Sequence, residues 1–191
     1  MTSKPFPSAR AGLALLALCG AALLPTQADA AALAPGSTVS AVFKQMNVPV
    51  TGQFKSFSGD VQFDPAHLDK SHANIVVETG SFDLGDPSFN ENARGKDWLA
   101  AASFPKATFV SSAIQPAGAG SYKVSGKLTI RGKTVETSTV VKFQQQGAQQ
   151  VFDGALPVHR LAVGVGQGEW ADTSVVADLV ELRFHLVTRG K

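Results

Sequence analysis

Hydrophobic and polar residues alternate along most of the chain after residue 30, in short runs that end at Gly, Pro, Asn or Asp. The cleanest run lies close to the end of the sequence, where Leu182, Phe184 and Leu186 alternate with polar neighbours. Alternation with this period places apolar side chains on one face of a β-strand and polar side chains on the other. The pattern therefore predicts an all-β fold of half-buried strands joined by tight turns.

Nine strands are predicted from these runs. They are expected over residues 38–45, 50–57, 59–63, 73–78, 107–114, 122–130, 135–143, 151–158 and 176–188. Between Asp83 and Phe104 the period changes, and Ser88 and Glu91 have the spacing of a capping box at the start of a helix. We expect one short helix within residues 88–102, weakened by Gly95.

The first thirty residues have the layout of a secretory signal. Lys4 and Arg10 precede an apolar run over residues 11–24, and Ala28-Asp29-Ala30 is a small-x-small cleavage signature. The run counts 24 − 11 + 1 = 14 residues, which is shorter than the roughly 20 needed to span a bilayer. The sequence predicts cleavage after Ala30, export of the product, and one domain over residues 31–191.

Removal of this segment changes the chemistry that remains. It removes Cys19, the only cysteine, so the mature protein would have no disulfide, no thiolate nucleophile and no sulfur-bound metal. It also removes two basic residues and one acidic residue, which leaves 17 − 2 = 15 basic and 15 − 1 = 14 acidic side chains. The mature chain would therefore have no excess of positive charge to attract nucleic acid or anionic lipid.

A closed barrel is the expected arrangement of these strands, because closure leaves no exposed sheet edge. A β-sandwich is one alternative. An outer-membrane barrel is another, but it requires aromatic girdles at two interfaces, and this chain has one Tyr and two Trp. Its twelve Phe, many of them near the middle of predicted strands, instead indicate an apolar interior.

One sequence pattern is shared with a known family. It comprises Ser40-x-Val42-Phe43, Gly52-x-Phe54-x-x-Phe57-x-Gly59-x-Val61-x-Phe63-Asp64, the 90–99 helix, Phe104-Pro105-x-Ala107-Thr108-Phe109-x-Ser111 and Gly126-x-Leu128-Thr129-Ile130-x-Gly132. This pattern resembles the YceI family over nearly all of the mature chain. Residues 160–165 and Trp170 resemble its closing segment, with Ala162 and Val163 in place of an acidic residue and a phenylalanine.

The resemblance implies a single antiparallel eight-stranded lipocalin-like barrel with a long internal tunnel. It also implies export to the periplasm and binding of a polyisoprenoid or a similar amphiphilic lipid, such as an isoprenoid quinone or a fatty acid. We expect no cofactor, no metal and no catalytic residues. The tunnel candidates are Phe43, Phe54, Phe57, Phe63, Trp98, Leu99, Phe104, Phe109, Leu128, Phe143, Phe152 and Phe184. Arg94, on a helix that would cover the barrel, is the candidate contact for a lipid head group.

Other apparent sites have simpler interpretations. Gly164-x-Gly166-x-Gly168 lacks the third glycine of a dinucleotide fingerprint and is expected to form a strand bend or bulge. His67 and His72 lie in a polar loop and are expected to be solvated rather than to bind a metal. No Gly-x-Ser-x-Gly nucleophile elbow occurs.

Two other functions remain open at this stage. The first is a filled barrel whose outer surface docks a membrane redox protein, and the second is an enzyme that acts on a lipid or its amide. The oligomeric state is also left open.

Overall fold

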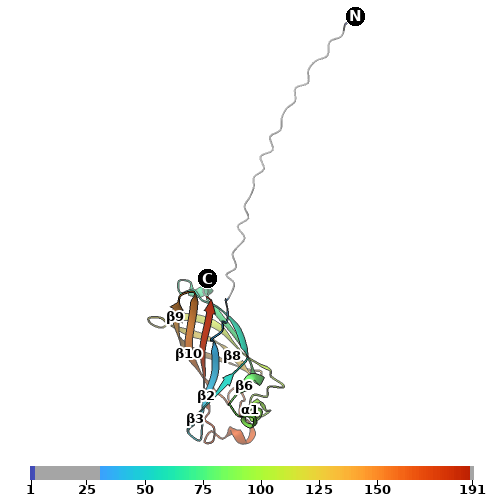
Figure 1. Cartoon of the computed structure of the whole chain (residues 1–191), viewed down its shortest axis with the longest axis vertical. Helices are drawn as coiled ribbons and strands as arrows, with labels where there is room; N and C mark the ends of the chain where they lie inside the picture. Colours follow the sequence, from blue (N-terminus) through green and yellow to red (C-terminus); the bar gives the residue numbers. More distant parts are fainter. Residues whose placement is uncertain (3–30, 190–191) are drawn as a thin grey trace.

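The structure is a computed structural model that describes residues 1–2 and 31–189. The predicted signal segment therefore lies outside the described residues, except for its first two positions. The described residues form one curled antiparallel sheet with a single short α-helix (Figure 1). Within the described ranges, no helix has the length and the apolar character needed to cross a membrane.

The sheet contains eleven strand segments. They are β1 (Ala31–Ala32), β2 (Thr38–Gln45), β3 (Val48–Phe54), β4 (Phe57–Gln62), β5 (His72–Glu78), β6 (Phe82–Asp83), β7 (Lys106–Pro116), β8 (Ser121–Ile130), β9 (Lys133–Gln146), β10 (Gln149–His159) and β11 (Leu179–Arg189). Short 3-10 helices occupy Leu68–Lys70, Thr79–Ser81 and Gly168–Ala171. All nine predicted strands are present, with ends shifted by at most three residues, and β1 and β6 are too short to have been predicted from periodicity.

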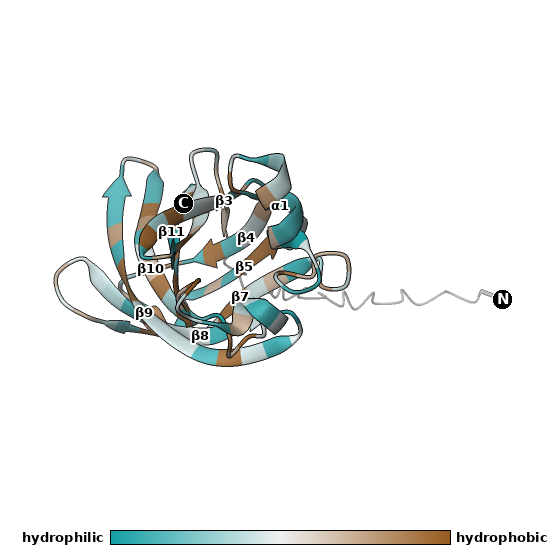
Figure 2. Cartoon of the chain, turned by 90° about the horizontal axis from the view of Figure 1, so that it is seen from below, coloured by the Kyte–Doolittle hydropathy of each residue, from teal (hydrophilic) through white to brown (hydrophobic). Residues whose placement is uncertain are grey.

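The N-terminal segment closes the barrel. The strand order is β1-β4-β5-β7-β8-β9-β10-β11-β2-β3-β6. Ala31 is paired with Val61 of β4, and two residues later Leu33 forms a bridge with Thr188 of β11. Residues 31–34 therefore lie between β4 and β11 and join two distant parts of the sheet. Seen from below, the strands curve around a common interior (Figure 2).

The eleven segments correspond to eight bent ribbons. β1 and β2 lie end to end beside β11 and together form one ribbon. β3 and β4 also lie end to end and form the next ribbon, because β3 pairs with β2 and β4 pairs with β1. β5 and β6 likewise continue each other as partners of β4 and β3. Merging these three pairs gives 11 − 3 = 8 ribbons, so the predicted eight-stranded antiparallel barrel is confirmed.

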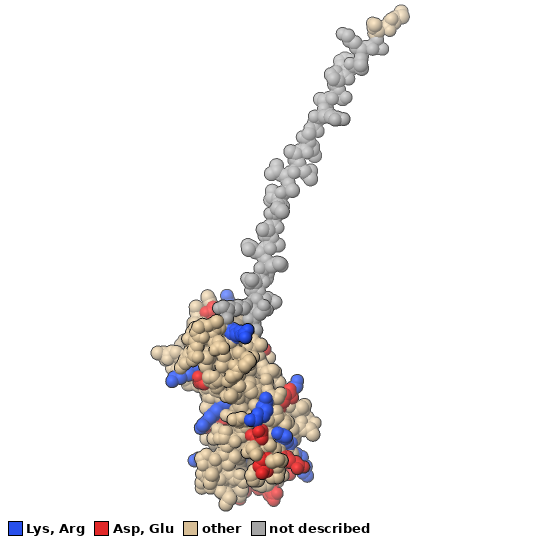
Figure 3. All heavy atoms as spheres, viewed as in Figure 1, with Lys and Arg blue, Asp and Glu red and all other residues tan. Residues whose placement is uncertain are grey.

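The barrel has two different ends. We call one the hairpin end; it carries the turns at 117–120 and 147–148 and the loop at 63–71. We call the other the helix end; it carries α1 (Pro87–Arg94), the β2–β3 turn and the segment 160–178 (Figure 1). Figure 3 shows basic and acidic side chains interspersed over the face in view, with acidic side chains gathered toward the helix end.

The helix begins earlier and is shorter than the sequence pattern predicts. The side chain of Asp86 accepts hydrogen bonds from the backbone N–H groups of Ser88 and Phe89, and Pro87 occupies the first turn. The predicted capping box that starts at Ser88 is therefore wrong, because Asp86 caps a helix that proline can begin. The helix ends at Arg94, and turns follow over residues 95–103.

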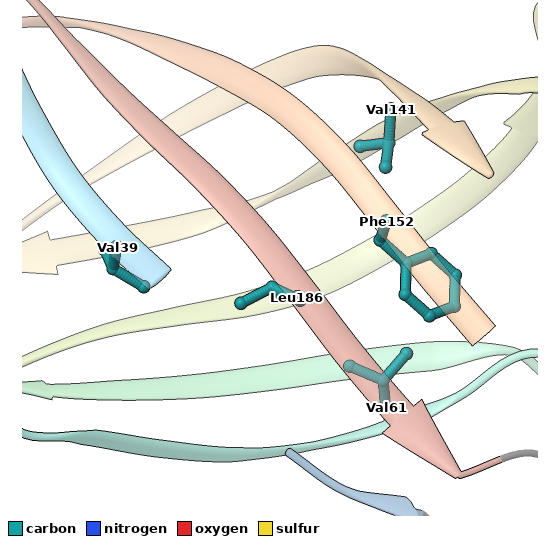
Figure 4. Close-up of a cluster of buried hydrophobic side chains, with 5 residues drawn as sticks. All are labelled: Val39, Val61, Val141, Phe152 and Leu186. Atoms are coloured by element: carbon teal, nitrogen blue, oxygen red, sulfur yellow. The ribbon is translucent and has the colours of Figure 1, made fainter. Parts of the chain in front are cut away.

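Two clusters of buried side chains lie on the inner wall of the barrel. The first, nearer the hairpin end, contains Val39, Val61, Val141, Phe152 and Leu186, whose side chains come from five strands and point toward one another (Figure 4). The second cluster lies nearer the helix end. Its members are Leu128, Ile130, Leu156, Val158 and Val163.

Candidate functional site

The barrel interior contains a cavity of about 490 Å³. Its walls are formed by inward-facing side chains of the strands, by part of α1, and by residues 98–99 and 160–176. Alternation along each strand produces this lining: on β11, for example, Val180, Leu182, Phe184 and Leu186 all face the cavity. Many lining side chains, Phe43 and Phe109 among them, are only half-buried although the barrel surrounds them. The interior is therefore hollow rather than packed.

Glycines at inward positions make room for aromatic rings. A Cβ on Gly154 would lie 2.4 Å from the Phe184 ring on the neighbouring strand, and one on Gly52 would lie 2.2 Å from the Phe82 ring. Both distances are far shorter than an ordinary contact, so a Cβ at either position would fit only if the ring moved. Because the rings lie over the glycines, they occupy the wall of the cavity rather than its middle.

Aromatic rings close the cavity at the hairpin end. The ring of Phe63 lies 4.7 Å from that of Phe143, 4.8 Å from that of Tyr122 and 5.4 Å from that of Phe152, measured between centroids. Tilted and edge-on pairs at these distances are favourable arrangements for aromatic rings. We call these four residues the aromatic plug.

The cavity reaches the surface at the helix end. Three residues that line it, Gln45, Phe89 and Asn92, are themselves exposed, and all three lie at this end. Phe89 exposes 61% of its surface, which is unusual for a phenylalanine. The site is thus an apolar chamber with one closed end and one open end.

Arg160 is the single Lys, Arg, Asp, Glu or His among the lining residues in the described part of the chain. Its side chain is almost completely buried, with 2% exposed. Nε donates to the carbonyl oxygen of Ala177, Nη1 to those of Val165 and Gly166, and Nη2 to that of Val176. The guanidinium also lies 5.6 Å from the centre of the Trp98 ring.

The charge of Arg160 is solvated by dipoles rather than cancelled by a carboxylate. Burial lowers the pKa of Arg160, and the nearby charge of Asp178 opposes that change. The Asp178 carboxylate itself accepts hydrogen bonds from Leu161 N–H at 3.0 Å and from the His159 ring at 2.8 Å. No carboxylate within the described ranges comes close enough to Arg160 to form an ion pair with it. A positive charge therefore remains beside an apolar chamber.

The segment 160–178 is shaped around this side chain. Gly166 has a φ of 78°, and a Cβ there would lie 2.1 Å from Nη1 of Arg160. The N–H groups of Gly166 and Gln167 donate to the carbonyl oxygen of Asp97, which ties this segment to the turn that carries Trp98. The predicted strand bend or bulge at residues 164–168 is wrong, because Gly164, Gly166 and Gly168 all adopt positive φ outside the strands, in a loop that leads into the 3-10 helix Gly168–Ala171.

Most of the predicted tunnel residues lie on the cavity wall. These are Phe43, Phe54, Phe63, Trp98, Leu99, Phe109, Leu128, Phe152 and Phe184. Phe57, Phe104 and Phe143 do not: Phe57 and Phe143 pack against the first buried cluster, and Phe104 lies against Gly132. Phe143 contributes to the plug instead.

Arg94 also lies outside the lining. Its Nε and Nη2 both donate to the carbonyl oxygen of Phe82, at 2.9 and 2.6 Å, which holds α1 against β6. The cation that faces the cavity is Arg160, which sequence reasoning did not assign to the site. The sequence does contain a signal for this role. Arg160 is followed by a short apolar run and then by Gly164, Gly166 and Gly168, and a glycine-rich loop of this kind can fold its backbone carbonyl groups around a cation.

The two histidines of the 63–72 region have acidic neighbours. His67 Nδ1 lies 2.7 Å from Asp64, and His72 Nε2 lies 3.7 Å from Asp60, with both histidines exposed. Among the described residues, no group of three or more potential metal ligands comes together.

Comparisons with known proteins agree with this architecture. The model of the YceI-like domain family matches residues 32–188. A UPF0312 protein of Shewanella oneidensis is 32% identical over 161 residues, which cover 81% of this chain and 74% of that protein. The crystal structure of BcnA from Burkholderia cenocepacia is 55% identical, with a TM-score of 0.78 over 80% of this chain and 96% of that one.

A more distant solved structure has the same fold. It is that of a polyisoprenoid binding domain from Saccharophagus degradans, implicated in plant cell wall breakdown. It is 17% identical, with a TM-score of 0.64 over 85% of this chain and all of that chain.

Proposed function

We propose, from the premise that the chain belongs to the YceI-like domain family, that it binds a long-chain amphiphilic lipid in its barrel. A polyisoprenoid or a similar lipid is the expected class. The single observation that carries the proposal is the hollow chamber of about 490 Å³, which is mostly apolar and open at one end. The polyisoprenoid-binding description of the Saccharophagus degradans domain supports the same ligand class.

Apolar contact alone gives such a chamber enough affinity. Each methylene moved from water into an apolar site contributes about 0.8 kcal/mol. A chain of about fifteen carbons would therefore gain roughly 12 kcal/mol before the cost of association is subtracted. The volume also falls within the roughly 300–1,000 Å³ typical of small-molecule sites.

We further propose that the protein acts in the periplasm as a carrier or reservoir, after removal of residues 1–30. The signal-like sequence supports export. A carrier needs no catalytic group, and a chamber that shields a hydrocarbon chain from water is sufficient for this role.

Native mass spectrometry of protein purified without detergent tests the proposal. A co-purifying lipid, or stoichiometric uptake of an added prenyl lipid, is the expected result. A compact protein that stays empty when lipid is added would refute lipid binding and favour the docking of a membrane protein. Chemical turnover of the added lipid would identify an enzyme instead.

Two tryptophan variants supply a matched control. Ala73 lines the cavity, whereas its neighbour Asn74 is exposed on the outside of β5. Ala73→Trp should fill part of the chamber and reduce lipid uptake, and Asn74→Trp should leave uptake unchanged. Equal uptake by the two variants would place the lipid outside the barrel.

A further inference from the structure

The cavity has a chemical polarity along its axis. The hairpin end is closed by the aromatic plug, whereas the helix end is open and contains Arg160. A ligand that is apolar throughout would gain nothing from a buried cation at one end of its site. An amphiphile with a polar head would match this arrangement, because buried charges in proteins are normally paired.

The guanidinium retains capacity for one more acceptor. Arginine has five N–H donors, and four of them are used by the backbone carbonyls of residues 165, 166, 176 and 177. One N–H of Nη2 has no acceptor among the described residues. The four carbonyls fix the orientation of the guanidinium, so a ligand would find it already positioned.

From these observations we propose that the helix end is a subsite for an anionic oxygen head group, phosphate or carboxylate, recognised by Arg160. The tail of the ligand then runs toward the aromatic plug. This inference rests on the proposed lipid binding and adds to it the class of head group, the residue that selects it and the direction in which the lipid lies.

The head-group class can be tested by measuring the affinities of two lipids that have the same tail but different head groups. Wild-type protein should bind a prenyl phosphate roughly 10- to 100-fold more tightly than the prenyl alcohol of equal length, as a charge-assisted hydrogen bond in a buried site predicts. Binding of neither lipid would refute lipid binding itself. Equal binding of both would refute only the subsite.

Variants assign the selectivity to Arg160. Arg160→Met keeps most of the apolar stem and should abolish the preference for phosphate while the alcohol still binds. Lys133→Met is the control, since Lys133 is an exposed cation at the same end that does not line the cavity. It should retain the preference. A preference that survives in Arg160→Met would refute the assignment.

The wild-type protein alone tests the direction, in case Arg160→Met fails to fold. Its only two tryptophans, Trp98 and Trp170, line the cavity at the helix end with centroids 5.4 Å apart, and its only tyrosine is in the plug. A fatty acid with a nitroxide beside the carboxylate should quench tryptophan fluorescence more strongly than one with the nitroxide at the methyl end. The opposite order, or equal quenching, would overturn the proposed orientation.

Discussion

Two glycines on the inner wall of the barrel should respond differently to the same substitution. A Cβ on Gly154 would meet the ring of Phe184 at 2.4 Å, whereas a Cβ on Gly126 would meet the backbone carbonyl oxygen of Val110, also at 2.4 Å. An ordinary contact begins near 3.4 Å, so in each case the obstructing atom must move by about 1 Å. The ring can rotate into the cavity, but the carbonyl belongs to a strand that is hydrogen-bonded to its neighbours.

The energies follow from what has to move. Displacing the Phe184 ring costs about 0.5–1.5 kcal/mol, and Ala recovers about 0.5–1 kcal/mol over Gly in a strand. Gly154→Ala should therefore change the free energy of unfolding by less than about 1 kcal/mol. Gly126→Ala should be destabilising by about 2–3 kcal/mol, because overpacking against backbone shifts the strand itself.

Urea denaturation of delipidated protein checks this difference, with lipid removed because a bound ligand stabilises the folded state. Lipid affinity provides a second measurement. The displaced ring occupies cavity volume, so Gly154→Ala should bind a long-chain lipid more weakly than wild type. A larger loss of stability in Gly154→Ala than in Gly126→Ala would refute the reasoning, because it would mean that the ring has no hollow to enter.

Two further predictions concern stability. Thr188 and Thr79 are both fully buried, but Thr79 Oγ1 donates to Phe104 at 2.7 Å whereas Thr188 Oγ1 has no partner among the described residues. Thr188→Val should be neutral or stabilising by up to about 1 kcal/mol, because it removes a buried hydroxyl that has no partner among the described residues. Thr79→Val should be destabilising by about 1–2 kcal/mol, because it removes a hydrogen bond. Thermal or urea unfolding measures both changes, and the reverse order would contradict this reasoning. Burial raises the pKa of Asp178, but hydrogen bonds from Leu161 N–H and the His159 ring, together with nearby positive charge, outweigh it and lower the pKa overall. The Asp178 carboxylate therefore stabilises the folded state fully above its unfolded pKa near 4, and this stabilisation is lost as the pH falls through the lower folded pKa. When the free energy of unfolding is measured from pH 6 to pH 2, it should decrease less in Asp178→Asn than in wild type.

Strand positions could be predicted well because alternation reflects the local geometry of the sheet. On β11, the alternation of Leu182, Phe184 and Leu186 predicts that they share one face, and the structure places all three on the inner wall. The helix was harder to delimit because its first turn depends on a side-chain cap. Asp86 and Ser88 both fit that role by residue type, and only the backbone conformation distinguishes them.

The open end could not be predicted from periodicity. Arg160 enters the site because the loop that follows it folds back and surrounds its guanidinium with carbonyls, a contact set by tertiary structure. Arg94 looked equally suitable in sequence, but its donors are used to hold α1. Long-range contacts of this kind decide which cation faces the cavity, and no local pattern distinguishes the two arginines.

The closure of the barrel by residues 31–34 has a practical consequence for how the protein can be handled. Ala31 is paired with Val61, and Arg189 is paired with Gln149 beside the β9–β10 turn, so the first residue of the barrel and the last described residue both lie at the hairpin end (Figure 1). An affinity tag or a surface anchor joined directly to the barrel at Ala31 or Arg189 would be attached at the end opposite the opening. If the protein is immobilised on a sensor chip in this way, every molecule will have the open helix end of its cavity facing the flowing sample.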